Sequence, residues 1–164
     1  MNATKTVILL LAGVALLGMP AVLRADPVDG HMDFRGLGTY KTKVRVHYAP
    51  APYDGQKLWA GQLRVNYKES SYVGYCVDIF QAAGDDGVTE LSPLDVPGGD
   101  MAACLFETYG DSVGSGREAG GLQSAIWEVL CEDPSNGYDV TSGAFSISNN
   151  SGAVSAANTM LASL

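Results

Sequence analysis

Two residues of this 164-residue chain could react with each other: Cys76 carries a thiol, which is a nucleophile as the thiolate, and Gln123 carries an electrophilic side-chain carbonyl. A thiolate that attacks the side-chain carbonyl of a glutamine expels ammonia and leaves an internal thioester. The reaction needs a carbonyl held against sulfur, surroundings that favour thiolate attack and shielding of the product from water. Gln123 lies in the apolar helical pattern GGLQSAIWEVLC, where a buried amide needs hydrogen-bond partners or costs free energy. A thioester would remove both the free thiol and the buried amide.

The cysteine count supports this pairing. The chain has three cysteines, and an oxidising compartment favours pairs, so one is left over. We expect Cys104 and Cys131, in two successive predicted helices, to form a disulfide. Cys76 then stands alone, either as a buried free thiol that acts as a small hydrophobe or as a thioester partner. A cysteine hydrolase is disfavoured because no third group stands out to orient His31 or His47.

The residues around Gln123 predict how the bond is protected. Gln123 and Trp127 are four positions apart, so they share one edge of the predicted helix. We expect Tyr75 and Trp127 to shield the bond from water. Gly120 and Gly121 are poor helix formers, and we expect them to let the Cys76 strand come close to the helix.

Strands are predicted in the first half of the chain. Residues 40–48 alternate between apolar and polar side chains, which is the two-residue period of a strand with one wet face. Residues 57–67 and 71–80 are two further predicted strands, joined as a β-hairpin by the polar link 68–70. Cys76 falls in the third predicted strand.

Helices are predicted in the second half. Residues 101–109 form a helical pattern that ends at Gly110, and Ser115 with Glu118 is a capping box for a second helix that runs to about Asp133. A third amphipathic stretch covers 153–164, with Val154, Ala157, Leu161 and Leu164 on one face. The sequence therefore predicts an α+β fold: an antiparallel β-sheet or barrel-like N-terminal part followed by a small helical subdomain.

The N-terminus resembles an export signal. Residues 1–25 combine a short basic start, an apolar run and a small residue before a cut, as in a secretory signal peptide. Residues 26–38 are rich in glycine and aspartate and predict a flexible leader, and 39–164 are then one domain. We expect the protein to be secreted or held at the cell surface, without a transmembrane span in the mature chain.

Charge restricts the partners. Removing Lys5 and Arg24 from the 10 basic residues leaves 8 against 18 acidic ones, a net charge of −10. Nucleic acid is therefore an unfavourable partner. Residues 81–164 hold 12 acidic groups and one basic group, Arg117. This favours a solubilising face over a site for cations or a basic partner. The aspartates of 81–100 lack EF-hand spacing, and we expect no metal and no cofactor.

Two motifs resemble a known family. The YCVD segment around Cys76 and the LQSAIWEV segment around Gln123 are similar to the two halves of the signature of bacterial surface thioester domains. Residues 59–164 also resemble thioester-domain proteins that carry PEP-CTERM sorting tails. The resemblance implies an adhesin-type module with a Cys76–Gln123 thioester near the junction of its β-rich and helical parts.

The resemblance also implies a function, covalent adhesion. An amine or hydroxyl on a surface protein or polysaccharide attacks the Gln123 carbonyl, and Cys76 leaves as a thiol. A lysine then remains attached through an amide. The bond is used once, so the protein is expected to be a covalent binder and not an enzyme. The chain ends at Leu164 in a helical pattern without a sorting tail, so a fragment or a released protein is expected.

Two other classes stay open. A noncovalent carbohydrate- or protein-binding module would use Tyr40, Tyr48, Tyr53 and Tyr67 as contact aromatics, although such residues more often serve strand packing. A purely structural extracellular domain would use Gln123 as a hydrogen-bonded core amide. The intact mass separates the thioester protein from the other two classes, because the thioester lacks the mass of one ammonia.

Overall fold

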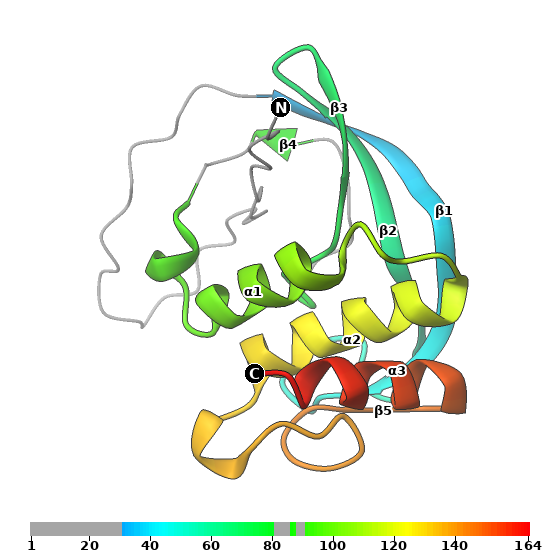
Figure 1. Ribbon diagram of the computed structural model, residues 1–164, viewed down its shortest axis with the longest axis vertical. Helices are drawn as coiled ribbons and strands as arrows, with labels where there is room; N and C mark the ends of the chain where they lie inside the picture. The colour runs from blue at the N-terminus through cyan, green and yellow to red at the C-terminus, as the bar shows by residue number, and fades with distance from the viewer. Residues whose placement is uncertain (1–30, 81–85, 88–90) are drawn as a thin grey trace.

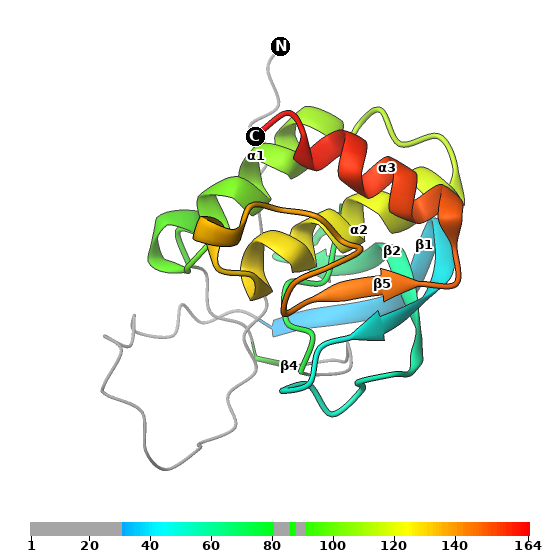
Figure 2. The same ribbon diagram turned by 90° about the horizontal axis from the view of Figure 1, so that it is seen from below.

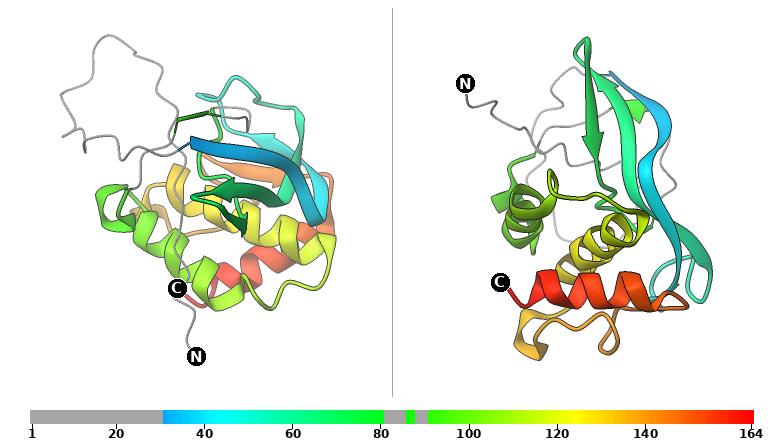
Figure 3. Two further views of the ribbon diagram at one scale, coloured as in Figure 1. Left: turned by 90° about the horizontal axis from the view of Figure 1, so that it is seen from above. Right: turned by 45° about the vertical axis from the view of Figure 1, so that its right-hand side comes forward.

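The computed structural model describes residues 31–80, 86–87 and 91–164 (Figure 1). The predicted signal peptide, residues 1–25, and the first part of the predicted leader, 26–30, lie outside these residues. The described chain has an α+β fold, as predicted, in which helices cover one face of an antiparallel sheet (Figure 3).

The sheet is built around one long strand. β1 (His31–His47) pairs with β2 (Lys57–Tyr67), which pairs with β3 (Ser70–Gly74). The two ends of β1 pair with the short strands β4 (Asp86–Gly87) and β5 (Ser146–Ser148). The predicted β2–β3 hairpin is confirmed. Its turn uses positive φ angles of 46° at Lys68 and 62° at Glu69.

β1 begins earlier than the sequence indicates. Residues 31–38 were predicted to belong to the flexible leader, but they form the first half of β1. Two register shifts interrupt its pairing with β2, one between Phe34 and Leu37 and one between Leu37 and Lys41. These irregularities break the two-residue alternation, so the strand is hidden in the sequence. Met32 and Phe34 pack with β2 in a small apolar cluster of their own.

The three helices lie near their predicted positions: α1 (Gly99–Tyr109), α2 (Gly116–Cys131) and α3 (Ser151–Leu161). Two short 3-10 helices, Pro93–Asp95 and Pro134–Asn136, stand in the connections. The Ser115 hydroxyl accepts a hydrogen bond from the Glu118 N–H at 3.2 Å, so the predicted cap is present. α2 ends at Cys131, because Glu132 is already extended.

α3 differs from its prediction at both ends. It begins at Ser151, where the Asn150 side chain accepts a hydrogen bond from the Ala153 N–H at 3.1 Å. It ends at Leu161. Leu164 therefore lies beyond the helix with 46% of its surface exposed, and it does not belong to the buried face on which it was predicted.

α2 is the centre of the fold. Every residue from 119 to 129 is buried, which is typical of a helix enclosed on all sides. The helix packs on β1 and β2 on one side and against α1 and α3 on the other (Figure 2). Of the helices in the described parts of the chain, none is long and apolar enough to cross a membrane.

Candidate functional site

The structure brings Cys76 and Gln123 together. The backbone N–H of Cys76 donates a hydrogen bond to Gln123 Oε1 at 2.9 Å. In return, Gln123 Nε2 donates a hydrogen bond to the backbone carbonyl of Cys76 at 2.6 Å. Gln123 is 1% exposed, so this pair of bonds lies inside the protein. The side-chain amide of α2 is thereby held against the backbone of the residue that carries the thiol.

Cys76 does not lie in a strand, contrary to the prediction. β3 ends at Gly74, whose ladder partner is Leu63, and Cys76 follows in an irregular connection. Backbone groups that leave a sheet need new partners. Gln123 supplies both of them for Cys76, so the backbone groups of this residue are paired although it lies outside the sheet.

The Cys76 thiol is held in its protonated form. Burial raises its pKa to about 11, and the negative charge of Asp78 acts in the same direction. The thiol donates a hydrogen bond to the backbone carbonyl of Asp78 at 3.1 Å, which also favours the protonated form. Hydrogen bonding from the Asp78 backbone and from the Trp127 side chain to the sulfur acts in the opposite direction and lowers the pKa. The surroundings therefore do not favour a free thiolate, which differs from the environment expected for thioester formation.

Trp127 brings an unpaired donor to this site. The residue is 3% exposed, and its indole N–H has no hydrogen-bond partner among the described residues. Leaving a buried donor unsatisfied costs about 1–3 kcal/mol. Because the indole also lowers the pKa of the Cys76 thiol, its N–H is near the sulfur. The fold thus places the indole N–H beside the Cys76 sulfur.

Tyr75 is the other aromatic residue expected beside the bond. It is 6% exposed, and its ring packs edge-to-face against Phe106 of α1 with the centroids 6.0 Å apart. Burial raises the pKa of its hydroxyl. Tyr75 therefore links the Cys76 connection to α1.

Gly120 and Gly121 allow a close approach, but their neighbours differ from the prediction. A Cβ atom on Gly120 would lie 2.4 Å from the Thr42 methyl carbon of β1. A Cβ atom on Gly121 would lie 2.5 Å from the Ala156 Cβ of α3. The atoms nearest to both glycines belong to β1, β2 and α3, and none belongs to the Cys76 connection. α2 is enclosed on all sides, so its glycines serve the contacts with the sheet and with α3.

The remaining two cysteines are free thiols in the structure. Cys104 is exposed on α1, whereas Cys131 is half-buried at the end of α2. Burial raises the pKa of the Cys131 thiol to about 12, and the nearby charge of Glu128 adds to this shift. The Cys104–Cys131 disulfide stays a prediction for the exported protein.

A buried carboxyl group, Glu128, was missed in the sequence. It is fully buried, its Oε1 accepts a hydrogen bond from the Asp139 N–H at 2.9 Å, and its Oε2 has no partner in the described parts of the chain. Burial raises its pKa to about 7. One turn later, Glu132 accepts hydrogen bonds from the backbone N–H groups of Ala144 and Phe145. The available signal was an acidic residue inside the apolar run AIWEVL.

The aromatic residues considered for noncovalent binding are largely occupied in packing. Tyr67 is 3% exposed, and Tyr40 and Tyr48 pack against the main core. Tyr53 is half-buried. Residues 31–80, 86–87 and 91–164 contain no group of three acidic, histidine or cysteine residues that could hold a metal ion.

Comparisons of the chain with protein-family models, with curated proteins and with solved structures find no match.

Proposed function

We propose that this protein is a secreted or cell-surface adhesin-type domain in which Cys76 and Gln123 form an internal thioester. The reciprocal pair of hydrogen bonds between the Gln123 amide and the Cys76 backbone carries the proposal. Such preorganisation can accelerate an intramolecular attack by many orders of magnitude. The sequence resemblance to bacterial surface thioester domains points to the same pair.

Formation of the bond can be written with all atoms accounted for. Cys76 Sγ attacks Gln123 Cδ, a C–S bond forms, and the thiol proton passes to the amide nitrogen. The C–N bond then breaks and ammonia leaves. The Cys76 N–H already donates to Oε1, where negative charge develops during the attack. The unpaired indole N–H of Trp127 is a second donor for that oxygen or for the sulfur.

The second reaction captures the target. An amine or a hydroxyl on a surface protein or polysaccharide attacks the Gln123 carbonyl, and the Cys76 sulfur leaves as a thiol after taking up a proton. A lysine would remain attached through an amide and a hydroxyl through an ester. The bond is consumed in the process, so the protein binds covalently and does not turn over.

A purely structural role is the second candidate, and one observation favours it. The Gln123 amide satisfies both backbone groups of Cys76 at 2.9 and 2.6 Å, so the amide is useful without any reaction. In that case Gln123 replaces the strand partner that Cys76 lacks. Both candidates require the same contacts and differ only in whether the amide survives.

The intact mass of freshly exported protein decides between them. A thioester predicts the loss of one ammonia, and methylamine should then add at Gln123 and release the Cys76 thiol. Gln123→Ala and Cys76→Ala should each abolish the labelling. Gln62→Ala is the matched control, since Gln62 is also buried and its Oε1 accepts a hydrogen bond from the Tyr40 N–H at 3.1 Å. If fresh protein has not lost ammonia and is not labelled by methylamine, the thioester is excluded and the structural role of Gln123 is supported.

A further inference from the structure

The outer face of the sheet carries a cluster of cations. Val44 and Val46 are fully buried, so the alternate residues of β1 point away from the helices. Directly opposite residues of antiparallel strands share a face, and the register places Lys43 opposite Trp59 and Arg45 opposite Lys57. We name this surface the basic strip. It consists of Lys41, Lys43, Arg45, Lys57 and Trp59.

No carboxylate neutralises the basic strip among the described residues. Lys41 Nζ donates to the Gly38 carbonyl at 2.9 Å, and Arg45 donates to the Gly55 carbonyl. The Lys43 ammonium lies 4.9 Å from the centroid of the Trp59 ring. Lys57 is exposed, and its side chain has no hydrogen bond or ion pair with another described residue. The four positive charges therefore remain available to a partner.

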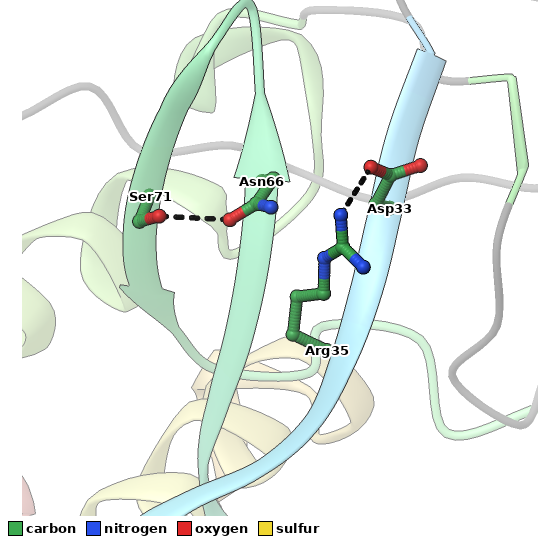
Figure 4. Close-up of polar contacts among 4 residues, drawn as sticks. All are labelled: Asp33, Arg35, Asn66 and Ser71. Atoms are coloured by element: carbon green, nitrogen blue, oxygen red, sulfur yellow. Dashed lines mark hydrogen bonds and ion pairs between the residues drawn. The ribbon is translucent and has the colours of Figure 1, made fainter.

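The end of the sheet that contains residues 33–35 and 66–71 is different. Asp33 and Arg35 of β1 form an ion pair at 2.9 Å, and Asn66 and Ser71 hydrogen-bond to each other across β2 and β3 (Figure 4). Polar groups there are satisfied within the protein. Arg64 of β2 is a further exposed cation at this end, where it donates to the Arg35 carbonyl at 3.3 Å. The cations are nevertheless densest in the half of the sheet that contains residues 41–45 and 57–59.

Charge is separated across the molecule. The helices cover one face of the sheet (Figures 1 and 3), and the alternation with the buried Val44 and Val46 points the basic strip away from them. Residues 91–164, which hold the helices, contain Arg117 as their single basic residue. The cations of the basic strip are thus gathered on one face of a protein whose net charge is negative. Such a face attracts an anionic polymer and orients it away from the acidic helices.

We propose that the basic strip is a docking surface for an anionic polysaccharide. Trp59 is 48% exposed beside the cations, and an exposed aromatic ring can pack against the C–H groups of a sugar. The cations on neighbouring strands and on alternate residues stand roughly 5–7 Å apart, which suits a chain with one acidic group per sugar ring. Double-stranded DNA is less suitable, because its one negative charge per ~1.7 Å would meet the acidic side of the protein.

This inference is independent of the thioester. Gln123 lies on α2, which packs on the inner face of β1 and β2, so the basic strip and the Cys76–Gln123 pair lie on opposite sides of the sheet. Docking through the strip would hold the protein on an acidic matrix and leave the other side free. Its test does not depend on whether the thioester forms.

The test is binding of the exported protein to immobilised polygalacturonate, with dextran sulfate, neutral dextran, polyglutamate and duplex DNA as comparisons. We expect binding to both acidic polysaccharides and not to neutral dextran, with affinity falling as salt rises. Lys57→Glu should weaken binding on the order of tenfold, since an exposed charge pair is worth up to about fivefold and reversal adds repulsion. Arg117→Glu makes the same charge change on the helical side and should have little effect.

Trp59→Ala separates a polysaccharide from other anions. It should weaken binding to polygalacturonate several-fold and leave any weak binding to polyglutamate unchanged. Melting curves check that the variants are folded. The proposal is overturned if polygalacturonate does not bind, if Lys57→Glu and Arg117→Glu act alike, or if polyglutamate or DNA binds as tightly as the polysaccharides without dependence on Trp59.

Discussion

The side-chain amide of Gln123 bonds to both backbone groups of Cys76, although the two residues are 47 positions apart in the chain. The glutamine supplies the two hydrogen bonds that a neighbouring strand could supply if β3 continued past Gly74. This contact holds the thiol-bearing residue against an electrophilic carbon, and the predictions below follow from it and from the helix that carries Gln123.

The first prediction concerns the indole N–H of Trp127. Trp127→Phe removes the unpaired donor and keeps an aromatic ring in the core. We expect a folded protein whose thioester forms more slowly by roughly a hundredfold, as when a single oxyanion donor is removed. The measurement is titration of the Cys76 thiol over time after export. Unchanged kinetics would show that the N–H contributes nothing to the reaction.

The second prediction concerns the packing of Gly121. Alanine normally stabilises a helix over glycine by up to about 1 kcal/mol. Here the added Cβ would lie 2.5 Å from the Ala156 Cβ and 3.0 Å from the Ala157 nitrogen of α3. We therefore expect Gly121→Ala to lower the free energy of unfolding by about 1–3 kcal/mol.

Urea denaturation measures the Gly121 effect. Gly74→Ala is the control, because no atom lies within 4 Å of a Cβ added at Gly74 beyond its chain neighbours. That variant should stay within about 0.5 kcal/mol of the parent. A stabilised Gly121→Ala protein would contradict the close contact with α3.

The third prediction concerns pH and Glu128. Its pKa is raised from 4.5 to about 7 in the folded protein by burial, with the charges of Glu132 and Asp139 adding to the effect. A raised pKa stabilises the fold fully below the unfolded pKa, and this contribution is lost as pH rises through the folded pKa. The free energy of unfolding should therefore fall between pH 4.5 and about 7.

Glu128→Gln tests this pH dependence. Glutamine keeps an oxygen that can accept the Asp139 N–H, but it does not titrate, so the fall over this interval should disappear. Glu107→Gln, at an exposed position of α1, is the matched control and should retain the fall. Denaturation curves at several pH values give the free energy of unfolding of each protein. If this free energy depends on pH in the same way in the parent and in Glu128→Gln, then Glu128 is not the cause of the fall.

The fourth prediction concerns Cys104 and Cys131. The two residues are 27 positions apart, and a disulfide between them would stabilise the protein by roughly 3 kcal/mol in the chain-entropy model. We expect the bond in protein exported to an oxidising compartment, although both thiols are free in the structure. Peptide mapping without reductant is the measurement. Alkylation of both cysteines in exported protein would count against the bond.

Local patterns predicted the regular elements well. β2 has the predicted bounds of Lys57–Tyr67, and the Ser115 cap marks the start of α2. Alternation and capping are visible in the sequence because they depend on residues a few positions apart. β1 shows the limit of this approach, since its register shifts remove the period on which the prediction depends.

The sequence by itself determined that Gln123 is an amide in a buried helix and that one cysteine is left without a pair. Tertiary structure decided that the amide bonds to the backbone of Cys76, that Gly121 faces α3, and that Glu128 is buried without an ion pair in the described chain. The physical reason is that burial and hydrogen-bond partners depend on segments far apart in the chain. Periodicity records which side of a helix is buried, but it does not record what lies against that side.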